Sequence, residues 1–412
     1  MNRQRLLQRF LRYVRIHTTA NDDADAYPSS DGQWELGKLL VEELQAMGIE
    51  NAHQDEHGLI YATVPANVDR QTPVVAFNSH LDTSPETSGE NVQPQVIESY
   101  AGGDIVLPGD TTKVITVSEN PELESLQGAT LITTDGTTLL GGDDKAGIAI
   151  IMELAEHLLE HPEISHGAIR ILFTCDEEIG RGVQHVDFEK LAADVCYTLD
   201  GPAANDVDTE TFSADMATVT ITGVNIHPSI AKDRMVNAIR AAGEFLSRLP
   251  RETLAPEATE GRDGFLHPYH LEGLVAEAKL RIILRDFEAP KLEEQANLLR
   301  EVAAKVAADF PGLDVNVDVR KQYRNMREGL LKEPRAVEYA VEAHRRLDRD
   351  PNLAIIRGGT DGSQLTEQGL PTPNLSSGQH NPHSPLEWAC LDEMEQAVEV
   401  LVQLVQIWAE EK

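Results

Sequence analysis

The first 200 residues alternate between amphipathic helical patterns and short apolar runs. Apolar positions three and four residues apart predict helices, and continuous apolar runs between turn residues predict buried strands. The helices are predicted over 2–17, 34–47 and 146–159, the strands over 73–77, 129–134, 168–174 and 195–199, and a hairpin over 51–64. Residues 83–130 are rich in Pro, Gly and polar residues and predict an irregular excursion. Strands that alternate with helices indicate an α/β domain.

The pattern changes after Gly201. Strands are predicted over 216–222, 271–276, 279–287 and 313–319, and helices over 235–249 and 289–309. This βαββαβ order favours a small α/β sandwich inserted in the main domain. The chain then returns through a helix at 333–347, a strand at 352–356 and a closing helix at 392–411. The predicted domains are 1–211 with 324–412, and the inserted 212–323.

Composition excludes several classes of protein. The 412 residues carry 69 acidic and 35 basic side chains, a formal net charge of −34, which argues against binding nucleic acid. Residues 1–15 lack the continuous apolar core of a secretory signal, and no apolar run reaches the ~20 residues that cross a bilayer. The 3 cysteines suit reduced thiols, so we expect a cytoplasmic location without membrane contact. The acidic surface fits salt adaptation and an ordinary acidic protein equally well.

Side chains that bind metals follow the predicted strands. His80-x-Asp82 ends the strand over 73–77, and Glu177-Glu178 and Asp200 end two later strands. Asp143 stands with a second aspartate at the start of a helix, after two glycines. Each motif alone also fits a solvated turn, but together they predict one metal site at the strand ends. Carboxylates with a few imidazoles suit Zn, Mn or Co, and a shared carboxylate suits a two-metal hydrolase.

Several longer stretches resemble one enzyme family. The matching segments are 78–86, 134–147, 173–180, 283–287 and 357–362. They resemble the peptidase T family of tripeptide aminopeptidases, within the co-catalytic zinc metallopeptidase superfamily. The resemblance implies a zinc-exopeptidase-like α/β fold: a mixed sheet flanked by helices, with an inserted, smaller ferredoxin-like α+β lid domain. It also implies tripeptide substrates and leaves a homodimer through the inserted domain open.

The resemblance implies a role for each matching residue. Asp143 would bridge two zinc ions. His80 and Asp200 would complete the ligands of the first ion. Glu178 and His383 would complete those of the second.

The remaining roles concern the residues around the ions. Asp82 would orient His80, and Glu177 would be the general base. A cis peptide would follow Asp143. His380 is a second candidate for the last ligand, but only His383 keeps the family's four-residue distance to a glutamate.

The resemblance also implies substrate contacts from four residues, His227, Asn237, Arg285 and Arg357. His227 would donate to the scissile carbonyl, Asn237 would add a polar contact, and the arginines would bind a carboxylate. Pairing of Arg285 with its neighbour Asp286 is the alternative. At the level of function, a carboxypeptidase, an N-acyl amino acid deacylase and a non-catalytic peptide-binding module remain alternatives to the tripeptide aminopeptidase.

Overall fold

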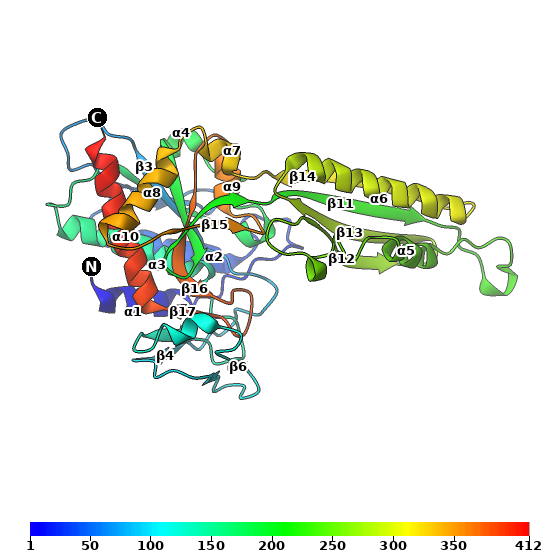
Figure 1. Cartoon of the computed structure of the whole chain (residues 1–412), viewed down its shortest axis with the longest axis horizontal. Coiled ribbons are helices and arrows are strands. Elements are labelled where there is room, and N and C mark those ends of the chain that lie inside the picture. The colour runs from blue at the N-terminus through cyan, green and yellow to red at the C-terminus, as the bar shows by residue number, and fades with distance from the viewer. Residues whose placement is uncertain (412) are drawn as a thin grey trace. The chain divides into compact units, whose positions relative to one another are not determined.

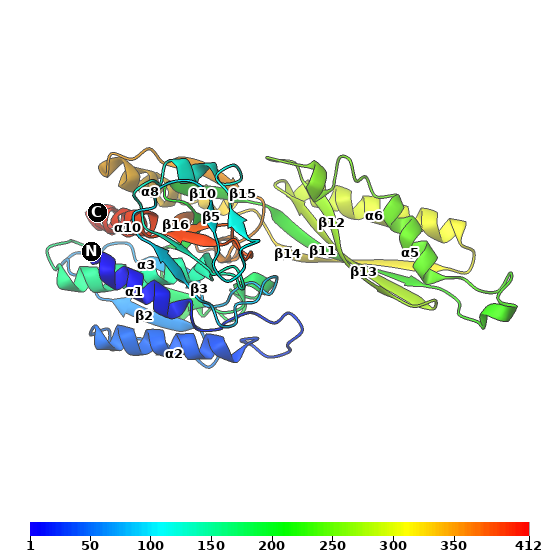
Figure 2. The same ribbon diagram turned by 90° about the horizontal axis from the view of Figure 1, so that it is seen from below.

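The computed structural model describes residues 1–411, which divide into two compact units. The first comprises Met1–Thr209, Glu328–Ala354 and the residues from Thr360 onward. The second comprises Glu210–Arg327 and the short segment Ile355–Gly359. The chain is shown from two directions in Figures 1 and 2.

The first unit contains a large sheet and the helices that cover it. The helices are α1 (Arg3–Tyr13), α2 (Asp31–Ala46), α3 (Gly142–Glu160), α4 (Phe188–Leu191), α8 (Arg335–Arg346), α9 (Asp361–Glu367) and α10 (Leu391–Glu410). The main strands are β1 (His53–Gln54), β2 (Ile60–Val64), β3 (Val75–His80), β4 (Gln95–Ile97), β7 (Leu131–Thr133), β8 (Ile169–Thr174), β9 (Val195–Pro202), β16 (Asn374–His380) and β17 (Trp388–Cys390). A separate ribbon pairs β5 (Ile105–Val106) with β6 (Val114–Ile115).

The sheet runs in the order β1-β2-β8-β3-β9-β16-β17-β7-β4. Its centre is parallel, because β3 pairs in parallel with β8 and β9, and β16 pairs in parallel with β9. The outer pairs are antiparallel. The sheet is therefore mixed, as the resemblance implies, and the carboxyl ends of its four parallel strands meet along one edge.

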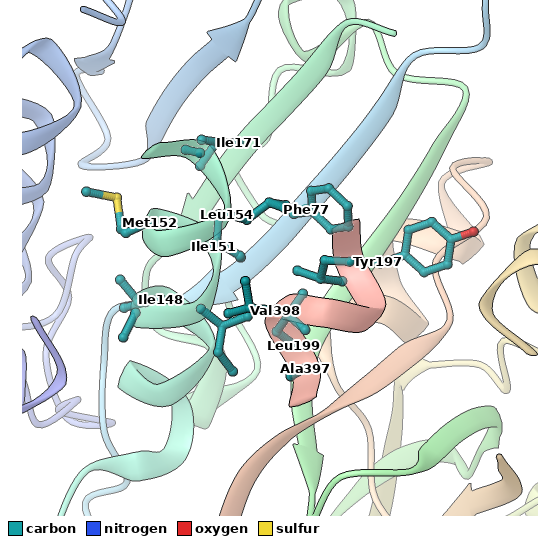
Figure 3. Close-up of a cluster of buried hydrophobic side chains, with 14 of the residues drawn as sticks. Phe77, Ile148, Ile151, Met152, Leu154, Ile171, Tyr197, Leu199, Ala397 and Val398 are labelled. Atoms are coloured by element: carbon teal, nitrogen blue, oxygen red, sulfur yellow. The ribbon is translucent and has the colours of Figure 1, made fainter. Parts of the chain in front are cut away.

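Alternating side chains place two hydrophobic clusters on the two faces of the central strands. Phe77 of β3 and Tyr197 of β9 join the larger cluster with α3 and α10, whereas Ala76 and Cys196 join a smaller one. Figure 3 shows the larger cluster, in which Ile151 of α3 lies near Phe77. The period of two is the reason that these short apolar runs form strands. The larger cluster packs α3 against the sheet.

The second unit follows the predicted βαββαβ order. Its elements are β11 (Ser213–Thr222), α5 (Ala238–Ser247), β12 (Phe265–Gly273), β13 (Glu277–Asp286), α6 (Ala289–Asp309) and β14 (Asp314–Tyr323). The sheet order is β12-β13-β11-β14, with every pair antiparallel. Side chains of α5 and α6 form a core with one face of this sheet. The unit thus has a hydrophobic core of its own.

The structure corrects several sequence predictions. His380 ends strand β16, a strand that the hydrophobic pattern does not predict. β12 begins at Phe265, six residues before its predicted start. Its first half contains His and Pro, which interrupt the alternation of apolar residues. β17 is too short for a periodic signal. β10 (Asp206–Thr211) is acidic, so hydrophobicity does not reveal it.

The predicted placement of Arg357 in the main domain is also wrong. The segment Ile355–Gly359 belongs to the second unit, because the backbone N–H of Phe212 lies within hydrogen-bond distance of two of its carbonyls. These contacts join residues far apart in sequence, which local patterns do not record. Among residues 1–411, three elements cross the sequence boundaries of the units: β10, α7 (Arg327–Leu330) and β15 (Asn352–Ile356). Within residues 1–411, no helix is long and apolar enough to span a bilayer.

Candidate metal centre

The predicted metal ligands gather at the carboxyl edge of the parallel strands. His80 is the last residue of β3, Asp200 lies near the end of β9, and Glu178 follows β8. His383 comes three residues after β16 ends. Asp143 reaches the same place from the start of α3. Parallel neighbours end at one edge, so the topology itself brings these distant residues together.

Asp143 is shared by two groups of ligand atoms. One oxygen-and-nitrogen group comprises His80, Asp143 and Asp200, and the other comprises Asp143, Glu178 and His383. Within each group the ligand atoms lie within 4.8 Å of one another. His80 Nε2 is 2.9 Å from Asp143 Oδ1, whereas His383 Nε2 is 3.4 Å from Asp143 Oδ2. The two oxygens of Asp143 thus face different groups, the geometry of a bridging carboxylate.

The backbone at Asp143 departs from the helix that it opens. Asp143 and Asp144 have non-helical φ and ψ angles, and the peptide bond between them is cis, as the resemblance implies. Gly141 has a φ of 82°, a value that glycine adopts at little cost. The turn directs the carboxylate of Asp143 toward His80. Asp144 is fully buried and accepts a hydrogen bond from the backbone N–H of His80 at 3.2 Å.

Asp82 supports both sides of the cluster. Its carboxylate lies 3.4 Å from His80 Nδ1, and its two oxygens accept the backbone N–H groups of Glu177 and Glu178 at 3.0 Å each. A carboxylate on one imidazole nitrogen fixes the ring and leaves the other nitrogen free to bind a metal. Asp82 therefore positions His80 and the acidic turn after β8 together.

The adjacent glutamates differ in their surroundings. Glu178 lies 2.9 Å from His383 Nε2 and belongs to the second group of ligand atoms. Glu177 belongs to neither group among the described residues, although its backbone is held beside Glu178 by Asp82. Burial is the main cause that raises the pKa of Glu177 well above its ordinary value, and Asp361 and Glu178 add to it. A carboxylate beside the ligands but outside them is available for proton transfer.

The two late histidines have different partners. His380 stacks on Trp388 with ring centroids 3.7 Å apart, and its Nε2 lies 2.7 Å from Glu393. His383 instead reaches Asp143 and Glu178. The geometry brings His383, and not His380, to the cluster.

Crowded negative charge characterises the site. Burial, followed by repulsion from Asp143, raises the pKa of Glu178 to about 7. Burial and the nearby aspartates also raise the pKa of Asp200 well above its usual value. Burial lowers the pKa of His383, but its hydrogen bonds to Asp143 and Glu178 outweigh that effect and raise it to about 12. A dication would relieve this repulsion.

The donor set fits metal ions. Glu178 Oε1 is buried without a hydrogen-bond partner within residues 1–411, which is costly unless another group binds it. Each group combines one imidazole with two carboxylates, donors that suit zinc and similar divalent ions. The residues present therefore suit two adjacent metal positions that share Asp143.

The predicted substrate residues of the second unit are engaged in local contacts. Asn237 Oδ1 caps α5 by accepting the N–H groups of Ile239 and Arg240 at 3.0 and 3.3 Å. His227 is exposed and lies 2.7 Å from Ser229 Oγ through its Nδ1. Each of these side chains keeps part of its hydrogen-bonding capacity free of these contacts.

The two predicted arginines differ more sharply. Arg285 donates to Gln322 at 3.0 Å and lies over the ring of Tyr323, while the neighbouring Asp286 is buried and accepts the N–H of Glu288. Successive strand residues point to opposite faces, so the pair with Asp286 does not form. Arg357 donates to the carbonyls of 261 and 263 and to the hydroxyl of 259, all at 2.9–3.0 Å. Arg357 thus fastens a loop of its own unit.

Sequence reasoning missed residues that hold the cluster from outside. Glu387 is buried, and its carboxylate accepts the backbone N–H groups of Leu140, Gly141 and Asp143 at 2.7, 2.8 and 3.1 Å. It fixes the turn that presents Asp143, and its spacing of four residues from His383 was the signal. Gln379 donates to Asp200 Oδ1 at 3.1 Å. Gln379 lies in β16, and no sequence signal marked it.

A parallel-sheet edge that gathers imidazoles and carboxylates around one shared aspartate defines a metal-binding hydrolase. The model of peptidase family M20/M25/M40 matches residues 134–407. The chain belongs to this family and is a peptidase. It is 45% identical over 406 residues to Peptidase T of Geobacillus kaustophilus, covering 98% of both chains.

Solved structures share the fold. An aminopeptidase PepT from Bacillus cereus superimposes with a TM-score of 0.75 at 23% identity, covering 100% of both chains. A tripeptidase from Staphylococcus aureus superimposes with a TM-score of 0.77 at 24% identity, again over 100% of both. At these identities the likeness shows the architecture alone.

Proposed function

We propose that this peptidase is a tripeptide aminopeptidase that uses two metal ions, with zinc as the expected metal. The observation that carries the proposal is the position of Asp143, which belongs to both groups of ligand atoms while Glu177 stands beside them. The full-length likeness to Peptidase T supports the substrate class.

Each ligand has a defined place in the proposal. His80 and Asp200 would hold one ion and Glu178 and His383 the other, with Asp143 between them. Ions bound there would supply Lewis acidity and lower the pKa of a water toward ~7. Asp82 keeps His80 in the tautomer that leaves Nε2 free. Glu387 holds the turn of Asp143 by three backbone hydrogen bonds.

Glu177 would act as the general base and then as the general acid. It would take a proton from the attacking water and pass it to the amine of the departing product. Glu177 would therefore end the reaction in the protonation state in which it began. Its raised pKa, caused chiefly by burial, suits a group that both accepts and donates a proton.

Substrate binding is proposed for residues of the second unit. His227 would donate to the scissile carbonyl and Asn237 would add a polar contact through its amide N–H₂, which the helix cap leaves free. Arg285 would bind the terminal carboxylate of the tripeptide. Arg357 is the weaker candidate, because four oxygens of its own unit accept its hydrogen bonds.

The decisive experiment is a turnover assay on a matched panel of substrates. The zinc- or cobalt-loaded enzyme is given di-, tri- and tetrapeptides of one composition and an N-acyl amino acid, and the released residue is identified by mass spectrometry. We expect release of the N-terminal residue from tripeptides alone. Release of the C-terminal residue would instead identify a carboxypeptidase, and release from the acyl amino acid would identify a deacylase.

A further inference from the structure

A second cluster of metal-binding side chains lies at the far end of α3. His157, Glu160 and His161 occupy the last turn of the helix and the residue that caps it. Asp143 stands at the opposite end of the same helix, about 20 Å away at 1.5 Å per residue. The cluster is therefore separate from the candidate metal centre.

The two histidines face each other because they are four residues apart on a helix. Their ring centroids are 4.4 Å apart, and one ligand atom from each histidine and from Glu160 lies within 4.8 Å of the others. The backbone N–H of His161 still donates to the carbonyl of His157 at 3.0 Å, so the helical spacing holds at the cap. The helix thus fixes the separation of the two imidazoles.

A carboxylate next to the cluster orients one ring. His161 Nδ1 lies 3.0 Å from Glu163 Oε1. A carboxylate on one nitrogen favours the tautomer whose other nitrogen carries a lone pair, the usual arrangement around metal-binding histidines. His161 is half exposed, so Nε2 can receive an ion from solvent.

Across the described residues, the ring of His157 is oriented by no carboxylate and differs from that of His161 in its burial. Its Nδ1 is buried and has no hydrogen-bond partner in the part of the chain that the structure describes. Burial is the first cause that lowers the pKa of His157, and the positive charges of the N-terminal amine and His161 add to it. A neutral imidazole keeps the lone pair that metal binding requires.

The surroundings set the charge that the cluster can accept. Glu160 already pairs with Arg5 at 2.7 and 3.0 Å, so it would share its carboxylate between the arginine and an ion. The carboxyl end of a helix favours a cation, because the last carbonyl groups carry partial negative charge. These contributions oppose each other, which indicates a site of moderate affinity.

We propose that His157, His161 and Glu160 form an additional binding site for a divalent transition-metal ion of borderline softness, such as Zn²⁺, Ni²⁺ or Co²⁺. Imidazole donors select these ions over Mg²⁺ and Ca²⁺, which prefer oxygen ligands. The site loads independently of the candidate metal centre. It adds one metal ion to the number that the chain holds.

The test counts metals at equilibrium. Full-length enzyme is first loaded with zinc, then dialysed against micromolar free Zn²⁺ or Ni²⁺, and bound metal is measured by elemental analysis. We expect the wild type to hold one ion more than the His157→Ala/His161→Ala double variant, and peptidase activity to be equal in both. The matched control is His53→Ala, which removes an exposed histidine outside any group of ligand atoms found within residues 1–411.

Single variants give a graded result. His161→Gln keeps a polar side chain and should weaken Ni²⁺ binding at least about tenfold by calorimetry. Glu163→Gln should weaken it less, because mutating a buried group that orients a ligand lowers metal affinity ~10–100-fold and Glu163 is exposed. Mg²⁺ in large excess should not compete. Equal metal counts in the wild type and the double variant, or displacement of Ni²⁺ by Mg²⁺, would overturn the proposal. Neither result would affect the proposed peptidase function, which the turnover assay tests separately.

Discussion

The functional residues that the sequence predicts fall into two sets with opposite surroundings. In the first unit, Asp143 and six other side chains come together from five segments, and several of their polar atoms contact one another. In the second unit, four side chains each contact a nearby loop, helix or strand. The first set makes a site by itself, while the second set makes local structure whose exposed atoms remain available.

The difference comes from topology. Strands that pair in parallel must end at a common edge, so a residue just past the end of β3 lies near residues just past β8 and β9. No comparable constraint gathers residues of a helix cap, a loop and a strand face in the second unit. A motif at a parallel strand end is therefore stronger evidence of a site than a polar residue on an antiparallel unit.

The largest expected effect is at the shared ligand. Asp143→Ala removes the carboxylate common to both groups, so the metal content should fall to one ion or none at the candidate metal centre and activity should vanish. Elemental analysis is made in the His157→Ala/His161→Ala background to exclude the helix-end site. Asp144→Asn is the matched control; if Asp143→Ala keeps both ions while the control loses them, the bridge is Asp144.

The next effect separates the two glutamates. Glu177→Gln should lower kcat by about 10²–10⁴-fold with both metals retained, because Glu177 lies outside the ligand groups. Glu178→Gln should lose metal, since its carboxylate belongs to the second group. Metal content and steady-state rates of both variants check the assignment, and loss of metal from Glu177→Gln would contradict it.

A smaller effect is expected from the second set. Arg285→Ala should lower kcat/KM for a tripeptide by about 1.5–3 kcal/mol, the contribution of a charge-assisted hydrogen bond. The C-terminal amide of the same tripeptide should be a poor substrate of the wild type and change little on mutation. Arg281→Ala, on the same face of β13, is the control. Equal cleavage of acid and amide by the wild type would show that Arg285 does not bind the carboxylate.

Arg357 should act on stability more than on substrate. Arg357→Ala removes hydrogen bonds to the loop around Gly261 and packing over Phe212, so unfolding free energy should drop by about 1–3 kcal/mol. Denaturant titration measures the drop, and the exposed Arg320→Ala should show none. If stability is unchanged while kcat/KM falls, Arg357 belongs with the substrate residues.

The smallest effect is at the cap of α5. Asn237→Ala should cost about 0.5–2 kcal/mol of stability, whereas Asn237→Ser keeps a capping oxygen and should recover most of it. Thermal unfolding of the three proteins gives the comparison. A fall in kcat/KM that Asn237→Ser does not restore would indicate a substrate contact in addition to the cap.

The sequence predicts the parts of this molecule that repeat a period or end a strand. Alternation in β3 and β9, the helical period of α3 and the βαββαβ order are all visible in one dimension. Gln379 is not visible in this way, because its partner Asp200 lies far away in sequence. Glu387 shows only its four-residue distance from His383, because the backbone N–H groups that it accepts lie far away in sequence. The hydrogen bonds that join Arg357 to the loop over 259–263 also connect residues far apart in sequence. Long-range hydrogen bonds leave no local pattern.

The strand order also has a consequence for synthesis of the protein. β16 and β17 lie between β9 and β7 in the sheet, yet they leave the ribosome after the whole of Glu210–Arg327. The second unit can therefore fold while the first still has a gap in its sheet, since domains generally fold as they emerge. His383 follows β16, so the nascent chain at that stage also lacks this candidate metal ligand. Peptide cleavage would therefore begin only after residues 374–390 have been synthesised.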